Sequence, residues 1–434
     1  MFSPAYKRYV LSILTVVYTL NFLDGGLIIL LLQPIKRDLN LSDTQLGFVT
    51  GIAFALFYAT LGLPIARWAD RGNRVTITSI AIALWGVTVM LCLLVTNFSQ
   101  LVFARIAAAV GESGCMPPTY SLLGDYFTAP AERTRAMTVY MLANPLSAVI
   151  SFVLGGWLND HFGWRITFFA MGIPALLVGV VVKLTVAEPR LGANHSRRLM
   201  APTVRTGDVL ATLWRQRSLR HLALALVLLY TMGAGLGPWY AAFMIRSHGM
   251  STSALGVWLG LIVGLSATAG IVTGGYVAAN WFSNNERGQM RLSAVAIASV
   301  VPCFALFLLL PEKHLALIAL APLMVVFNVF LGPTFALMQR LVRDDMRATT
   351  LAIVMLLANL IGMGVGPQVV GLLSDLLAPV FGADSLRYAM LAMSLVAFWA
   401  AYHFWQVGRM VKEELLVVAS GTQSRSSAFV SECL

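Results

Sequence analysis

The sequence is dominated by long apolar stretches, which occur twelve times and are separated by short polar segments. Each stretch has roughly 20 residues or more, the length that an α-helix needs to cross a bilayer core about 30 Å thick. Only 11% of the 434 residues are charged and 58% are hydrophobic, so the chain could not cover a water-facing surface. The stretches are also too continuously apolar for barrel strands, whose side chains alternate between lipid and lumen. We therefore predict an all-α membrane protein with twelve transmembrane helices.

The predicted transmembrane helices cover residues 8–32, 43–66, 75–96, 99–122, 134–158, 165–187, 219–245, 253–279, 290–310, 315–339, 348–373 and 386–408. The first of these stretches is longer than the apolar core of a signal peptide and has no obvious small-residue cleavage site. We therefore expect it to stay in the protein as the first helix.

Basic residues are distributed unevenly between the two sides of the predicted membrane protein. If both termini are inside, the cytoplasmic segments contain 22 lysines and arginines, whereas the outer segments contain 6. Because positive charge accumulates on the cytoplasmic side, this bias predicts that both termini are cytoplasmic. It also explains the net charge of +11 without a nucleic-acid partner. We expect an integral protein of the plasma membrane, which is the inner membrane if the source is a bacterium.

A hydrophilic segment divides the predicted helices into two groups of six. We predict an N-terminal six-helix bundle, a cytoplasmic linker, a C-terminal six-helix bundle and a cytoplasmic tail, over residues 1–188, 189–218, 219–410 and 411–434. The fifth and eleventh helices support an internal repeat, because each passes in the same order from an arginine through an Ala-Asn pair and a glycine to an aspartate. These residues are Arg135, Ala143, Asn144, Gly156 and Asp160 in one helix and Arg347, Ala358, Asn359, Gly371 and Asp375 in the other.

Three ionisable residues lie deep inside the predicted helices, where a charged side chain is unfavourable unless it is paired, protonated or hydrated. They are Asp24 in the first helix and Arg105 and Glu112 in the fourth. The spacing of Arg105 and Glu112 places them on one helix face, roughly 10 Å apart along the axis, and Asp24 falls between them in predicted depth. We expect a proton-coupling or substrate site, because a carboxyl group whose neighbours and solvent access change can gain and lose a proton. The alternative is a structural ion pair within the N-terminal bundle, which would need only two of the three residues.

The loop after the second predicted helix contains a motif. Residues 66–74 read Ala-Arg-Trp-Ala-Asp-Arg-Gly-Asn-Arg and resemble the cytoplasmic signature Gly-x-x-x-Asp-(Arg/Lys)-x-Gly-(Arg/Lys) of the major facilitator superfamily. Asp70, Arg71 and Arg74 match the signature, whereas alanine and asparagine replace its two glycines. Residues 105–111 are similar to the second motif of that superfamily. The resemblance implies two six-helix bundles and fits a cytoplasmic gate formed by the three matching residues, for which the alternative is ordinary positive-inside topology.

Four further stretches look like the spinster group of lipid transporters and its bacterial relatives. They cover residues 21–24, 34 with 41–47, 111–114 with 117–118, and 358–362 with 366–368. The resemblance places the first-helix acid of the group on Asp24, its fourth-helix glutamate on Glu112 and its arginine on Arg105. One departure is Gly25, since the group usually has an arginine at this position. Its absence removes a cation that would be expected beside an anionic headgroup.

Five polar residues are candidates to line a substrate cavity, namely Tyr58, Tyr120, Tyr140, Tyr230 and Asn359. Tyrosines have a polar tip on an apolar body and would suit an amphipathic ligand, although each could instead pack between helices. We predict a proton-coupled secondary active transporter that moves an amphipathic or lipid-like small molecule by alternating access. The alternatives are an organic-anion or hydrophobic-drug transporter of the same superfamily, or a membrane receptor or scaffold without transport activity. The intramembrane acids argue against a scaffold, which has no use for them.

The sequence contains no Gly-rich phosphate loop, no metal-ligand spacing and no nucleophile with a histidine base. We therefore expect no enzymatic activity, no cofactor and no metal ion. We expect a monomer whose partners are the lipid bilayer, protons and a small-molecule substrate. Helix-breaking residues cluster at three places, where we expect the helices to bend. These places are Asn144-Pro145, residues 233–238 and residues 362–367.

Overall fold

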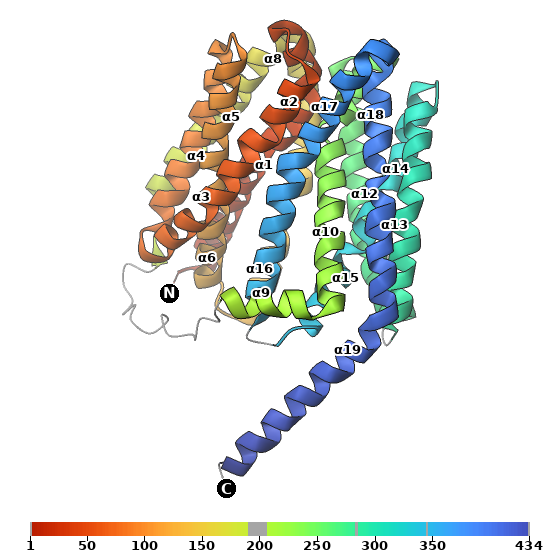
Figure 1. The fold of residues 1–434 in the computed structure, drawn as a ribbon. Helices are drawn as coiled ribbons and strands as arrows, with labels where there is room; N and C mark the ends of the chain where they lie inside the picture. The colour runs from red at the N-terminus through yellow and green to blue at the C-terminus, as the bar shows by residue number, and fades with distance from the viewer. Residues whose placement is uncertain (1, 190–205, 283–284, 344–345, 433–434) are drawn as a thin grey trace. The chain divides into compact units, whose positions relative to one another are not determined.

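The computed structural model describes residues 2–189, 206–282, 285–343 and 346–432, and every regular element in these ranges is helical (Figure 1). Before residue 190 the elements are α1 Pro4–Leu39, α2 Asp43–Thr50, α3 Ile52–Arg71, α4 Arg74–Leu91, the short η1 Cys92–Leu94, α5 Phe98–Ser113, α6 Met116–Tyr126, α7 Pro130–Met141 and α8 Ala143–Thr185. After residue 205 they are α9 Thr206–Arg215, α10 Arg217–Leu236, α11 Trp239–His248, α12 Thr252–Trp281, α13 Glu286–Leu309, α14 Lys313–Val329, α15 Leu331–Arg340, α16 Arg347–Leu357, the π-helix η5 Ala358–Met363, α17 Gly364–Phe381, the short η6 Gly382–Asp384, α18 Ser385–Ser394 and α19 Val396–Glu432.

Nine helical stretches of the described residues are long and apolar enough to cross a membrane. Two of them are far longer than one crossing requires, since Ala131–Thr185 has 55 residues and Thr349–Leu415 has 67. In the first, Gly163 has a φ of 80° and a non-helical backbone, so the chain turns inside α8 at a residue without a side chain. The prediction of an all-α protein with several membrane spans is confirmed. The count of twelve and the cytoplasmic termini stay predictions.

Contacts divide the chain into two compact units, called unit 1 and unit 2. Within the described parts of the chain, unit 1 consists of residues 1–200, 234–264 and 363–390, and unit 2 of residues 201–233, 265–362 and 391–434. In unit 1, α8 packs along α1 and α4; in unit 2, α13 packs along α14 and α19. Each unit combines segments of both predicted bundles, and the six-plus-six division stays a prediction. Residues 190–205 of the predicted linker lie outside the described residues, and its last part contains α9.

Helix boundaries lie at or near the three predicted breaker clusters. α7 gives way to α8 at Leu142, two residues before Asn144, and Asn144-Pro145 lies in the first turn of α8. Gly237 and Pro238 separate α10 from α11. Residues 358–363 form the π-helix that precedes α17, a distortion that is often found at functional sites. Bends of the helix axis at these places stay a prediction.

Glycines let α4 approach two of its neighbours, α5 and α8, closely. A Cβ atom added to Gly111 of α5 would lie 2.8 Å from the backbone nitrogen of Trp85 in α4. A Cβ atom added to Gly86 of α4 would lie 2.9 Å from the carbonyl oxygen of Gly172 in α8. Small residues at helix contacts are typical of membrane proteins, because they allow the backbones to come together. This packing holds α5, which contains two of the three predicted intramembrane charges, against α4.

Candidate functional site

Asp24 and Arg105, two of the three predicted intramembrane charges, form a buried ion pair in unit 1. Asp24 belongs to α1 and is 1% exposed, and Arg105 belongs to α5 and is 5% exposed. Nη1 of Arg105 donates a hydrogen bond to Oδ2 of Asp24. The same guanidinium lies over the ring of Phe54 in α3, 5.0 Å from its centre, where cation–π attraction favours it. Arg105 is therefore engaged by a carboxylate and by an aromatic face.

Glu112, the third predicted charge, lies two turns further along α5 and interacts with Asp24, Arg105 and Trp85. It is only partly buried and takes part in no ion pair with the residues that the structure describes. Oδ1 of Asp24 is buried and has no hydrogen-bond partner among the described residues. A protonated Glu112 could donate to this oxygen, whereas an ionised Glu112 would place two carboxylates against one guanidinium. The three predicted residues are thus brought together in an arrangement that can hold a proton.

Three of the predicted cavity tyrosines lie in unit 1, and a tyrosine that the sequence analysis missed joins them. Tyr18 of α1 stacks on Tyr140 of α7 with ring centres 4.5 Å apart. Tyr120 of α6 meets Tyr140 edge-on, with ring centres 5.4 Å apart, and interacts with Tyr18. Tyr58 of α3 interacts with Glu112. These four residues are called the tyrosine group, and Asp24, Arg105 and Glu112 are called the acid cluster. Tyr58 is the member of the tyrosine group that interacts with the acid cluster, and it also interacts with Tyr18 and Tyr120.

The two remaining cavity candidates, Tyr230 and Asn359, belong to unit 2. Tyr230 is half-buried in α10, and its hydroxyl lies 4.0 Å from the sulfur of Met355. Asn359 lies in the π-helix η5 and is half-buried. A Cβ atom added to Gly362 would lie 2.8 Å from the backbone of Tyr230, so η5 packs against this part of α10. These residues form a group of their own within unit 2.

Arg74, one of the three predicted gate residues, is fully buried in a network that the sequence analysis did not foresee. Its Nε donates to Glu188 at 3.1 Å, its backbone N–H donates to the same carboxylate at 2.7 Å, and its Nη1 donates to Asp125 at 2.7 Å. These contacts join the start of α4 to α6 and to the segment after α8 within unit 1. Arg71 is exposed, and the side chain of Asp70 lies outside the described residues. A gate at these positions stays a prediction.

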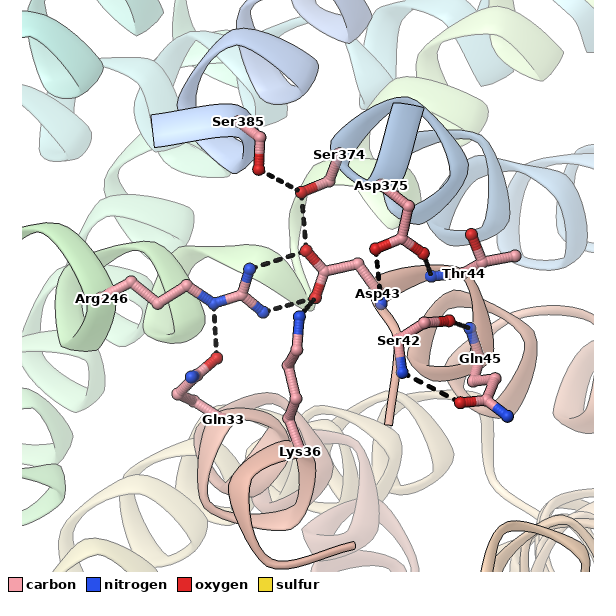
Figure 2. A network of polar contacts seen from close by, with 10 residues as sticks. All are labelled: Gln33, Lys36, Ser42, Asp43, Thr44, Gln45, Arg246, Ser374, Asp375 and Ser385. Carbon is pink, nitrogen blue, oxygen red and sulfur yellow. Dashed lines mark hydrogen bonds and ion pairs between the residues drawn. The ribbon is translucent and has the colours of Figure 1, made fainter. Parts of the chain in front are cut away.

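A second polar site in unit 1 surrounds the first turn of α2 (Figure 2). The carboxylate of Asp375, in α17, accepts from the backbone N–H groups of Asp43 at 3.1 Å and Thr44 at 2.7 Å. Ser42 caps the same turn by accepting from the N–H of Gln45 at 3.1 Å. The first N–H groups of a helix have no partners within it and carry a partial positive charge. A carboxylate from another helix is therefore favoured at this position.

The side chain of Asp43 is the centre of an ion cluster at the same place (Figure 2). Arg246 of α11 donates to both of its oxygens, at 2.7 and 2.6 Å, and Lys36 of α1 donates to one of them at 2.5 Å. Ser374 of α17 donates to it at 2.6 Å, while Gln33 of α1 accepts from Nε of Arg246 at 2.5 Å. The Asp43 side chain is 3% exposed, and a cavity of about 250 Å³ borders the cluster. Charged contacts thus join α1, α2, α11 and α17.

The first turn of α12 has a matching cap, which is provided by Asp160 of α8. The backbone N–H groups of Thr252 and Ser253 donate to its carboxylate at 3.1 and 2.9 Å. The hydroxyls of the same two residues donate to it as well. Ser251 accepts from the N–H of Ala254 at 3.3 Å. Each of the two helices is therefore capped by its own serine and by an aspartate from a different helix.

The two capped helix starts are related in sequence. Residues 41–47 read Leu-Ser-Asp-Thr-Gln-Leu-Gly, and residues 250–256 read Met-Ser-Thr-Ser-Ala-Leu-Gly. A Cβ atom added to Gly371 of α17 would lie 2.2 Å from a carbonyl oxygen of α2, and one added to Gly156 of α8 would lie 2.3 Å from a carbonyl oxygen of α12. Each of these glycines precedes its capping aspartate by one helical turn. The similarity of the two heptapeptides is the sequence signal that would have pointed to this site.

An all-helical protein with several membrane spans, an ion pair and a further carboxyl group in its apolar interior has the architecture of a membrane transporter. The sequence profile of the Major Facilitator Superfamily matches residues 14–367. The chain belongs to this superfamily, whose members are secondary transporters and not enzymes.

Individual relatives refine this assignment. The chain is 32% identical over 399 residues to an MFS-type efflux pump of Mycolicibacterium smegmatis, covering 90% of this chain and 91% of the pump. It is 23% identical over 411 residues to the sphingosine-1-phosphate transporter SPNS2 of Danio rerio, and the match covers 87% of this chain and 79% of that transporter. It also resembles the crystal structure of a bacterial homologue of the human lysosomal transporter Spinster in an inward-facing, unoccupied conformation. The TM-score is 0.83 and the sequence identity is 27%, and the match covers 95% of this chain and 99% of that homologue. The predicted relation to the spinster group is confirmed.

Proposed function

We propose that this chain is a proton-coupled transporter that moves an amphipathic small molecule by alternating access. The observation that carries the proposal is the buried cluster of Asp24, Arg105 and Glu112, in which two carboxyl groups share one guanidinium. One oxygen of Asp24 has no partner among the described residues. A proton on Glu112 would replace repulsion between the carboxylates with a hydrogen bond. Its gain and loss would therefore change how firmly α1 and α5 are held together.

The two helix caps are proposed to close the outer side. If two bundles span residues 1–188 and 219–410 with both termini in the cytoplasm, the capped starts of α2 and α12 face outward. Each cap then joins one predicted bundle to the other, because α2 meets α17 and α12 meets α8. The similar bacterial Spinster homologue was crystallised facing inward, a state in which the outer side must be closed. Release of both caps would accompany opening to the outside, and Asp70, Arg71 and Arg74 are the proposed gate on the inner side.

The test is transport into proteoliposomes under an imposed pH gradient, with substrates first selected by thermal stabilisation of the purified protein. Glu112→Gln should abolish the dependence of transport on the gradient, because an amide keeps the shape of the side chain but does not titrate. Asp24→Asn should act in the same direction. It also leaves Arg105 without its anion, which costs about 3–5 kcal/mol in a buried pair, so Glu112→Gln is the cleaner variant.

The matched control is Glu132→Gln, which changes an exposed acid of α7 whose side chain is 56% exposed. This variant should keep both the rate and its pH dependence. Transport by Glu112→Gln at the wild-type rate with an unchanged pH profile would contradict the proposal.

A further inference from the structure

The charges of the acid cluster do not balance when all three groups are ionised. Arg105 supplies one positive charge, which is engaged by Asp24 and by the face of Phe54. Glu112 then adds a negative charge that no described ion pair compensates. Such a charge is unfavourable inside a membrane protein unless a cation neutralises it. A proton is one such cation, and the positively charged end of a substrate is another.

Two aromatic residues, Tyr58 and Trp85, interact with the carboxyl group that carries this extra charge. Tyr58 interacts with Glu112 and stacks on Phe54 with ring centres 5.5 Å apart. Tyr18 and Tyr140 continue the aromatic surface with their stacked rings. The faces of aromatic rings are negative and attract organic cations, while the rings also bind hydrocarbon. A carboxylate beside such rings favours a lipophilic cation and disfavours an anion.

Four buried polar atoms in and next to the cluster lack hydrogen-bond partners among the described residues. One is an acceptor, Oδ1 of Asp24, and three are donors, namely Nδ2 of Asn21, Nε of Arg105 and Nε1 of Trp85. Asp24 and Asn21 are 1% and 3% exposed. Asn21 precedes Asp24 by one turn of α1, so the two side chains lie on the same face of the helix. Buried polar atoms usually have partners. The open acceptor on Asp24 provides a place for an N–H group or a positive charge of a bound molecule.

We propose that the transported molecule is a lipophilic organic cation, whose positive group replaces the proton at Glu112. This inference rests on the proposed function and names the substrate class of the same site. In one state Glu112 is protonated and can donate to Asp24. In the other state Glu112 is ionised, and the substrate cation lies between its carboxylate and the tyrosine group. Binding of the cation then releases a proton, and transport is an exchange of the cation for a proton.

The test compares two probes of the same shape and opposite charge, tetraphenylphosphonium and tetraphenylborate, on the full chain in lipid nanodiscs. Binding to empty nanodiscs is subtracted, and proton release is followed with a pH indicator in weakly buffered solution. We expect tetraphenylphosphonium to bind at least about tenfold more tightly and to release a proton on binding, because the site offers a carboxylate and aromatic faces. Equal affinity, or a preference for tetraphenylborate, would overturn the inference.

Two variants test whether this preference comes from the acid cluster. Glu112→Gln should abolish proton release and the preference for the cation, whereas the exposed Glu132→Gln should change neither. Gly25→Arg is a second variant, because Gly25 is exposed and a Cβ atom added there meets nothing within 4 Å. The new guanidinium, next to Asp24, should weaken binding of tetraphenylphosphonium and strengthen binding of tetraphenylborate. Proton release that persists in Glu112→Gln would overturn the inference.

Failure of the inference can be told apart from failure of the proposed function. Neutral and anionic amphiphiles are tested for transport driven by a pH gradient in the same proteoliposome assay. If these are transported in a way that depends on Glu112 while tetraphenylphosphonium shows no preference, the substrate class is wrong and proton coupling stands. If tetraphenylphosphonium binds with proton release but no probe is transported, the cation site stands and the transport proposal is wrong.

Discussion

The starts of α2 and α12 are built alike, yet only one of them carries an ion cluster. Both have a serine cap, an aspartate from another helix on their first two N–H groups, and a close glycine contact. At the first helical position α2 has Asp43 and α12 has Thr252. Asp43 binds Lys36 and Arg246, whereas the hydroxyl of Thr252 donates to Asp160. The aspartate on the backbone N–H groups is therefore common to both helix starts, whereas the ion pairs with Lys36 and Arg246 occur at α2.

The ion cluster should affect how strongly a single substitution weakens the contact at α2, more than it affects the strength of that contact in the intact protein. A buried ion pair is a weak net stabiliser, because loss of hydration offsets most of the attraction between the charges. Removing one partner is costly, because the other charges stay buried without compensation. We therefore expect the two contacts to be similar in strength in the intact protein. The contact at α2 should be much more easily damaged by a single substitution.

The largest effect is expected for Asp43→Asn, which leaves Lys36 and Arg246 without their shared anion. Loss of one partner from a buried ion pair costs about 3–5 kcal/mol, and the side chain of Asp43 is 3% exposed. The matched change at the other copy is Thr252→Val, which removes a hydrogen bond from a neutral hydroxyl to the Asp160 carboxylate, worth about 1.5–3 kcal/mol. Asp43→Asn should therefore strongly favour separation of α2 from α17, while Thr252→Val should have a smaller effect on α12 and α8.

Both distances can be measured by pulsed electron spin resonance in a cysteine-free background. Labels at the exposed Arg37 and Val380 report on the contact at α2, and labels at the exposed Phe162 and Val257 report on the contact at α12. Equal responses to the two substitutions would show that the ion cluster does not distinguish the copies.

Gly371→Ala and Gly156→Ala should have intermediate effects of similar size on the two helix contacts. They test the close glycine contact that the starts of α2 and α12 have in common. The added methyl groups would lie 2.2 and 2.3 Å from carbonyl oxygens of the opposing helices, and overpacking of this kind costs about 1–3 kcal/mol. Each variant should loosen its own contact in the same distance measurement. Gly124→Ala is the control, because a Cβ atom at Gly124 meets nothing within 4 Å. A large effect at one glycine and none at the other would mean that the backbone contacts are not equivalent.

The fold was accessible from sequence because hydropathy and helix breakers are local properties. Apolar stretches of membrane-spanning length predicted the all-α membrane protein, and the clusters at Asn144-Pro145 and residues 233–238 lie at or near helix boundaries. The turn at Gly163 inside α8 agrees with the gap between the predicted fifth and sixth helices. The two compact units could not be foreseen, since they depend on which helix ends contact one another.

The acid cluster could be predicted because a charge within an apolar stretch is conspicuous. The cap site was missed because Asp43, Arg246 and Asp375 lie at helix ends, where charged residues are ordinary. Their meeting depends on contacts between segments that are far apart in the sequence. Arg74 illustrates the same limit, since the sequence places it in a loop as part of a cytoplasmic gate, and it is fully buried against Glu188. Composition alone gives no sign of that pairing.

The smallest change in the label distances is expected when the salt concentration is raised. This experiment tests the electrostatic contribution of the ion cluster by itself. Raising the ionic strength from about 0.1 M to about 1 M shortens the screening length from about 10 Å to about 3 Å. Lys36 is 26% exposed and borders the cavity beside the cluster, so salt should weaken its attraction to Asp43 by at most about 1 kcal/mol. The label distance at α2 should therefore shift slightly toward separation, and the distance at α12 should not change. Lys36→Gln should reduce this response and Lys36→Arg should keep it. An equal salt response at both helices would mean that the ion cluster contributes nothing that sets the two copies apart.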